Sequence, residues 1–225
     1  MSANAASGRK AERYTGTERI LALSDGVFAI AITLLVLDVL PSHGDTLVHE
    51  VSSKTWSYVS YVLTFLIIGI IWTNHHQMFT QIKRANHAFL LLNVVFLMWV
   101  AALPFPAALL AEYIGTSNRT DQKGAVAIYT GAFVIGALLF NLLWWYSVYG
   151  ERLTGKDHDH EVVRQTTWSF YVGPVSYVVD FALAFINPTA SLVLFFLLAL
   201  YYAVAPTQAA GRLTARLPRS AGSRQ

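Results

Sequence analysis

"LALSDGVFAIAITLLVLDVLP", residues 21–41, is almost entirely apolar, yet it carries the carboxylate Asp25 near its start, with Arg19 just ahead of it. A bilayer core needs about 20 apolar residues per helix, so the segment is long enough to cross a membrane. A charged side chain near a membrane is costly unless it is paired or hydrated. The stretch therefore predicts a membrane-spanning helix whose carboxylate has a specific partner.

The composition of the whole chain agrees with a membrane protein. Of its 225 residues, 55% are hydrophobic and 13% are charged, whereas a soluble domain carries about 25% charged residues. The net charge of +3 is better explained by loops beside an anionic membrane than by nucleic-acid binding. The absence of cysteine excludes disulfides and thiol catalysis, and no phosphate-binding loop or nucleophile motif indicates an enzyme.

Apolar segments long enough to cross a bilayer recur along the chain, which predicts an all-α membrane protein with six transmembrane helices. Inside lipid every backbone donor must be satisfied within the element, so a helix is the expected form of each segment. The fifth and sixth segments are separated by a very short turn and should form a hairpin. We expect the spans at about residues 19–40, 56–76, 88–113, 125–149, 167–186 and 189–206.

Lysine and arginine are concentrated in both tails and in alternate loops. The positive-inside rule then places both termini in the cytoplasm. The chain divides into a cytoplasmic N-terminal tail (1–18), a six-helix transmembrane domain (19–206) and a basic cytoplasmic tail (207–225), as a multi-pass protein of the cell (inner or plasma) membrane. Because the tails are small and polar, we expect residues 1–15 and 207–225 to be disordered.

The start of the first span and the end of the second should lie at a similar depth in the membrane. The second span ends in "WTNHH", residues 72–76, so its polar side chains can reach the carboxylate of the first span. A structural hydrogen-bond network, a proton relay and a metal site all remain open. The residues expected to gather there are Arg19, Ser24, Asp25, Trp72, Asn74 and one of His75 and His76.

A metal site is the least favoured of these readings. Adjacent histidines on a helix point about 100° apart, so both rarely bind one metal ion. No zinc or di-iron spacing occurs in the spans, and we predict no metal and no cofactor. Asp180 is the deepest carboxylate, and the sequence leaves open whether it is an ion or proton site or a hydrogen-bonded structural group. Asn93 and Asn141 are expected to form interhelical hydrogen bonds.

The stretch "RILALSDGVFAIAITLLVLDVLP" resembles the opening helix of the transmembrane protein 175 family of potassium channels. The family signature is an arginine, a three-residue spacer and then Phe-Ser-Asp. Arg19, Ser24 and Asp25 match it in type and spacing, while Leu23 stands at the phenylalanine position. "IIWTNHHQMF" (70–79), "LNVVFLMWVAALPFPAALL" (92–110) and the six-span count are also similar to bacterial members.

This resemblance implies a potassium-permeable channel that assembles as a homotetramer in the lipid bilayer. It implies a pore lined by the first helix of each subunit, without the carbonyl filter of ordinary potassium channels. Carried over by position, the apolar pore-lining residues are Ile30, Leu34 and Leu37, and Thr33 is the polar neighbour implied in selectivity.

The residues themselves permit this reading without requiring it. Ile30, Leu34 and Leu37 follow an i, i+4, i+7 spacing and share one helical face, and Asp25 lies about 140° around the helix from Ile30. The same three side chains could instead face lipid. The alternative function is a proton-coupled or cation transporter that uses intramembrane carboxylates and histidines, namely Asp25, His75, His76 and Asp180.

Overall fold

The computed structural model describes residues 3–40, 47–82, 84–149, 153 and 160–214, and in these ranges the regular elements are all helices. The elements, in chain order, are α1 (Ala3–Leu34), the 3₁₀ helix η1 (Leu35–Val39), α2 (Leu47–Ser53), α3 (Thr55–Gln81), α4 (His87–Ala102), α5 (Pro104–Tyr113), α6 (Arg119–Val148), α7 (His160–Ile186) and α8 (Pro188–Thr214).

Several of these helices are long and apolar enough to cross a membrane. In the described ranges there are four such segments, Thr17–Val39, Thr55–Gln81, His87–Tyr113 and Arg119–Val148, and the shorter apolar stretches Gly173–Ile186 and Pro188–Tyr202 follow them. The prediction of an all-helical membrane protein is confirmed in this form, while the count of six spans stays a prediction.

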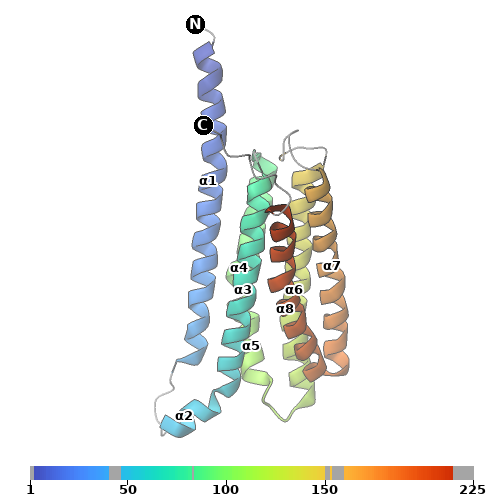
Figure 1. Ribbon diagram of the computed structural model, residues 1–225. Helices are drawn as coiled ribbons and strands as arrows, with labels where there is room; N and C mark the ends of the chain where they lie inside the picture. The colour runs from blue at the N-terminus through green and yellow to red at the C-terminus, as the bar shows by residue number, and fades with distance from the viewer. Residues whose placement is uncertain (1–2, 41–46, 83, 150–152, 154–159, 215–225) are drawn as a thin grey trace, which may run out of the picture.

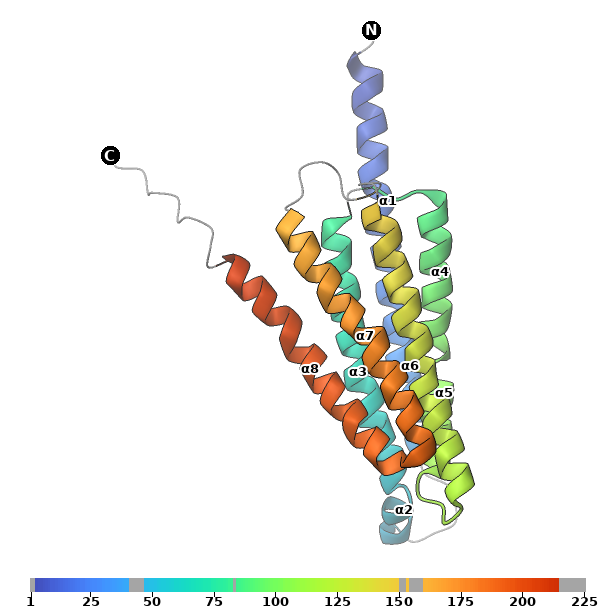
Figure 2. The same cartoon turned by 90° about the vertical axis from the view of Figure 1, so that its right-hand side faces the viewer.

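Helix α1 lies at one edge of the bundle (Figure 1). It packs against α3, α4 and α5, whereas α6 contacts α4, α5, α7 and α8. Figure 2 shows α1 continuing beyond the other helices at its N-terminal end, and α8 tilted against α7. Within one chain, the described helices that contact α1 therefore all lie on the same side of it.

Prolines and asparagines set the ends of several helices. Pro104 has no backbone N–H to donate, and the predicted third span divides there into α4 and α5. The side chain of Asn86 accepts a hydrogen bond from the Phe89 amide at 2.9 Å and caps α4. Asn187 does the same for α8, accepting from the Thr189 amide at 3.1 Å. The short turn expected between the last two spans is thus a capped hairpin.

Buried hydroxyl groups tie the inner helices together. The Thr64 and Tyr129 hydroxyls, on α3 and α6, lie 3.0 Å apart and share a hydrogen bond. Ser60 of α3 donates to the Ala107 carbonyl of α5 at 2.8 Å. Such pairing is required where no water is available to satisfy a buried polar group.

The structure has helix over residues 3–15 and 207–214, where disorder was expected, and the rest of the two tails lies outside the described residues. Helix α1 begins at Ala3 and α8 continues to Thr214, so both helices extend well past the predicted spans. Alanine, arginine, lysine and glutamate, which are good helix formers, are common in residues 3–19. Adding residues to a helix that already exists avoids the unfavourable nucleation step, which explains why polar tails can continue it.

Candidate functional site: the exposed face of α1 and its polar anchor

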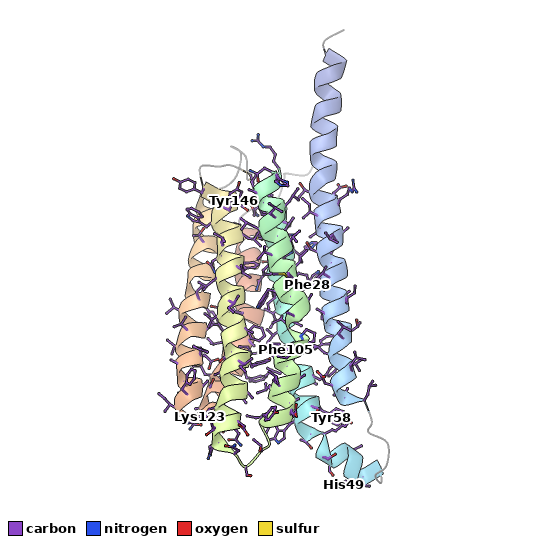
Figure 3. The ribbon with its side chains drawn as sticks, turned by 180° about the vertical axis from the view of Figure 1, so that it is seen from behind. Phe28, His49, Tyr58, Phe105, Lys123 and Tyr146 are labelled. Atoms are coloured by element: carbon purple, nitrogen blue, oxygen red, sulfur yellow. The ribbon has the colours of Figure 1, made fainter. Side chains whose placement is uncertain are left out.

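Helix α1 has a buried face and an exposed face. The buried residues recur every three or four positions, as one side of a helix requires. They are Ile20, Ser24, Phe28, Ala31 and Leu35. Phe28, labelled in Figure 3 between α1 and the rest of the bundle, is 1% exposed. This face fixes which way the helix is turned.

The opposite face carries the residues that the sequence analysis assigned to the pore. Ile30, Leu34 and Leu37 are 60%, 41% and 56% exposed in the single chain. Thr33 is also exposed and stands among them, and its hydroxyl donates to the Ile30 carbonyl at 2.9 Å. Ile30 and Leu34 on α1, and Leu37 on the adjoining η1, thus present large apolar side chains, with one hydroxyl oxygen, away from the bundle.

A chain of hydrogen bonds anchors the buried face. The Asn93 amide nitrogen, on α4, donates to Ser24 Oγ at 3.2 Å. Ser24 Oγ in turn donates to the Ile20 carbonyl at 2.9 Å. On its other side, Asn93 Oδ1 lies 3.0 Å from His75 Nε2 of α3. Asn93 therefore joins three helices.

The hydrogen bonds run in one direction, from His75 through Asn93 and Ser24 to the Ile20 carbonyl. Because Asn93 gives its N–H to Ser24 and offers its carbonyl oxygen to His75, His75 Nε2 must carry the hydrogen. The His75 ring is stacked on Phe96, with ring centroids 5.4 Å apart and planes at 4°, and its centroid lies 4.7 Å from that of Phe79. His75 Nδ1 is buried without a hydrogen-bond partner in the described part of the chain. The histidine thus fits the neutral Nε2–H tautomer in an aromatic cage.

Asp25 belongs to a second, separate contact. Trp72 Nε1 of α3 donates to Asp25 Oδ1 at 2.8 Å, at an exposed position. The Trp72 and His76 rings have centroids 5.8 Å apart. Within the described ranges no hydrogen bond or ion pair joins Asp25 to Arg19, which is exposed. The adjacent residues Ser24 and Asp25 thus bind different partners.

The structure separates the remaining candidates. His75 is buried and His76 is exposed, and Asn74 is half-buried without a hydrogen bond among the described interactions. The interhelical hydrogen bonds expected of Asn93, an asparagine inside the apolar run "LLLNVVFLMW", are confirmed by its contacts with Ser24 and His75. No group of His, Cys, Asp and Glu in the described ranges has the arrangement of a metal site.

Asp180 lies apart from this anchor, between α7 and α8. Ser191 Oγ is 3.0 Å from Asp180 Oδ1 and 3.2 Å from the Asp180 carbonyl oxygen. No hydrogen bond of the described residues connects it to Asp25 or His75. The four groups of the transporter alternative are therefore not gathered at one place.

A family model and two curated relatives all match this chain as a member of one family. The model of the family "Endosomal/lysosomal potassium channel TMEM175" matches residues 19–104. The chain is 42% identical over 189 residues to a protein of Streptomyces collinus named as a potassium channel, covering 82% of this chain and 90% of that one. It is 40% identical over 200 residues to one of Chamaesiphon minutus that is also named as a potassium channel, covering 87% and 97%.

A solved structure shows the same fold. The crystal structure of a lysosomal potassium-selective channel TMEM175 homolog from Chamaesiphon minutus superposes with a TM-score of 0.75 at 39% identity. The match covers 85% of this chain and 98% of that one.

Proposed function

This chain belongs to the TMEM175 family of potassium channels, and we propose that it forms a potassium-permeable channel whose pore is lined by α1 of each subunit. The observation that carries the pore assignment is the division of α1 into two faces. One face is anchored to α3 and α4 through Ser24 and Phe28, and on the other Ile30, Leu34 and Leu37 are left exposed by the described helices of the same chain.

Four copies of the chain arranged about a common axis complete this pore. Helix α1 stands at the edge of the bundle, where it can meet its symmetry mates without displacing another helix (Figure 1). Ile30, Leu34 and Leu37 then form three stacked apolar rings. A narrow apolar ring offers no ligand to a cation and closes by dewetting, so conduction requires the ring to widen. The homotetramer is the assembly that the family resemblance implies.

Thr33 supplies the polar element of this surface. Its hydroxyl hydrogen is directed to the Ile30 carbonyl, which leaves the oxygen lone pairs available on the exposed side. A ring of four such oxygens beside the Ile30 ring gives a partly dehydrated cation its nearest side-chain ligands. We therefore assign Thr33 to selectivity and the three apolar residues to the constriction.

The same proposal places six crossings in the cell membrane, with both termini in the cytoplasm. The support is the helical length of α7 and α8 together with the alternation of Lys- and Arg-rich loops. Residues 1–18 and 207–225 are then cytoplasmic segments, and the bundle between them is the channel domain.

Single-channel recording of purified protein in planar bilayers tests the pore. Ile30→Asn should raise conductance and lower the preference for potassium over sodium, because a hydrated ring admits sodium with its water. Thr33→Ala should change selectivity more than conductance. The matched control is Leu197→Asn on α8, where the side chain is 54% exposed but lies away from α1. Unchanged currents in Ile30→Asn would move the conduction path away from α1.

A further inference from the structure

Asp180 is a carboxyl group whose surroundings contain no positive charge. It is 0% exposed, and its Oδ2 atom has no hydrogen-bond partner among the described residues. Its side-chain partner is Ser191, which is also 0% exposed and donates to Oδ1 at 3.0 Å. A serine hydroxyl carries no charge, so it offsets only a small part of the cost of a buried carboxylate.

The helices packed around Asp180 offer no other countercharge. Helix α7 packs against α6 and α8, and α8 also packs against α3. No Asp, Glu, Lys, Arg or His occurs in residues 124–148 of α6 or 188–211 of α8, and Asp180 is the one such residue in 165–186 of α7. Residues 55–74 of α3 carry none either. The titratable group beside Asp180 is Tyr177 of α7, which in turn lies near Tyr129 of α6 and Tyr202 of α8.

Asp180 is too far from the end of α7 for its short side chain to reach water, as charged side chains near a membrane surface do. Asp180 precedes the capping residue Asn187 by seven positions (187 − 180), which at about 1.5 Å per residue is about 10 Å. Its side chain points into the bundle rather than outward, since it shares the buried face of α7 with Ala184. An ionised carboxylate here would be buried without a cationic partner among the described residues, which is strongly unfavourable.

We propose that Asp180 is a proton-binding site, in which the carboxyl is a neutral acid that shares a hydrogen bond between Oδ1 and the Ser191 hydroxyl, 3.0 Å apart. In this form the contact between Asp180 and Ser191 contains no charge. Loss of the proton at alkaline pH places a charge between the two helices and weakens their pairing. The stability of the protein therefore falls as pH rises through the range in which the carboxyl ionises, and it is greatest on the acidic side. This inference does not depend on where the pore lies.

Infrared spectroscopy and thermal unfolding of the full-length purified protein test the site. The wild-type spectrum should contain the carbonyl stretch of a protonated carboxyl group at neutral pH, with the shift in deuterated water that identifies such a group. This band should be absent in Asp180→Asn. The melting temperature of the wild type should fall by about 5 °C more than that of Asp180→Asn as pH is raised from about 6 to about 9. Asp121→Asn, at an exposed carboxylate of α6, should behave like the wild type.

Three results would overturn the proposal. One is a protonated-carboxyl band that persists in Asp180→Asn, and another is a pH dependence of melting that is the same in both proteins. The third is stabilisation of the wild type, but not of Asp180→Asn, by sodium or potassium at constant pH and ionic strength, which would make Asp180 a cation site instead. If Asp180→Asn does not fold, the test uses the wild type with isotopically labelled aspartate, whose label should shift the carbonyl band of the protonated carboxyl group. Absence of that band at neutral pH refutes the protonated form.

Discussion

Replacing Asn93 by leucine should destabilise the protein by about 2–4 kcal/mol. Leucine is close to asparagine in size, so the change removes hydrogen bonds and leaves little cavity. The lost bond to Ser24 is worth about 0.6–1.7 kcal/mol, as measured for interhelical bonds in membranes. His75 Nε2–H is left buried without an acceptor, at a further cost of about 1–3 kcal/mol. Ser24 keeps its own bond to the Ile20 carbonyl, so it adds no orphaned donor.

The assay is unfolding of the purified protein in mixed micelles with increasing sodium dodecyl sulfate, followed by tryptophan fluorescence. The matched control is Asn74→Leu, which makes the same chemical change next to His75. Asn74 has no hydrogen bond among the described interactions, so its replacement should cost less than about 0.5 kcal/mol. An equal loss of stability in the two variants would refute the conclusion that Asn93 is the centre of the anchor.

Three further predictions follow from individual contacts. Gly136→Ala should cost about 1–3 kcal/mol in the same unfolding assay, because the new Cβ would overlap the Trp99 ring. The control is Gly69→Ala, whose Cβ meets no atom within 4 Å and which should be neutral or stabilising. Trp72→Phe should cost about 1 kcal/mol or less, because its bond to Asp25 is exposed; a larger loss would mean that this contact is buried in the assembly. Since the chain has no cysteine, a single cysteine added at either terminus should resist an impermeant thiol reagent in intact cells, and labelling from outside would contradict the cytoplasmic assignment.

The sequence predicts the helical class from local patterns, whereas the choice of the exposed face of the first span came from the family resemblance. An apolar run of sufficient length needs no tertiary information to be identified as a span. The i, i+4, i+7 spacing places Ile30, Leu34 and Leu37 on one face only if the segment is α-helical throughout, and the structure has Leu37 in the 3₁₀ helix η1. The short elements α2 and η1 have no comparable pattern, since tertiary contacts and the end of a helix determine their form.

The partners within the anchor could not be read from the sequence to the same extent. Ser24 and Asp25 were expected in one network, but neighbouring residues on a helix point about 100° apart, and they reach different helices. His75 and His76 also point about 100° apart, so only one of them can face the anchor. The burial of His75 depends on the rings of Phe28 and Phe96, which come from distant parts of the chain, as well as on Phe79 one turn further along the same helix.

The 3₁₀ helix η1, which packs against α3 and α5 through the buried Leu35, determines how Leu37 is turned relative to Leu34. A 3₁₀ helix turns by 120° and rises by about 2.0 Å per residue, against 100° and 1.5 Å in an α-helix. Conversion of Leu35–Val39 to α geometry would swing Leu37 by about 60° relative to Leu34 and shorten the segment by about 2.5 Å. In the fourfold pore proposed above, this conversion would turn Leu37 in all four subunits and change the width of the pore at that level, while the hydrogen bonds of Ser24 stay in place.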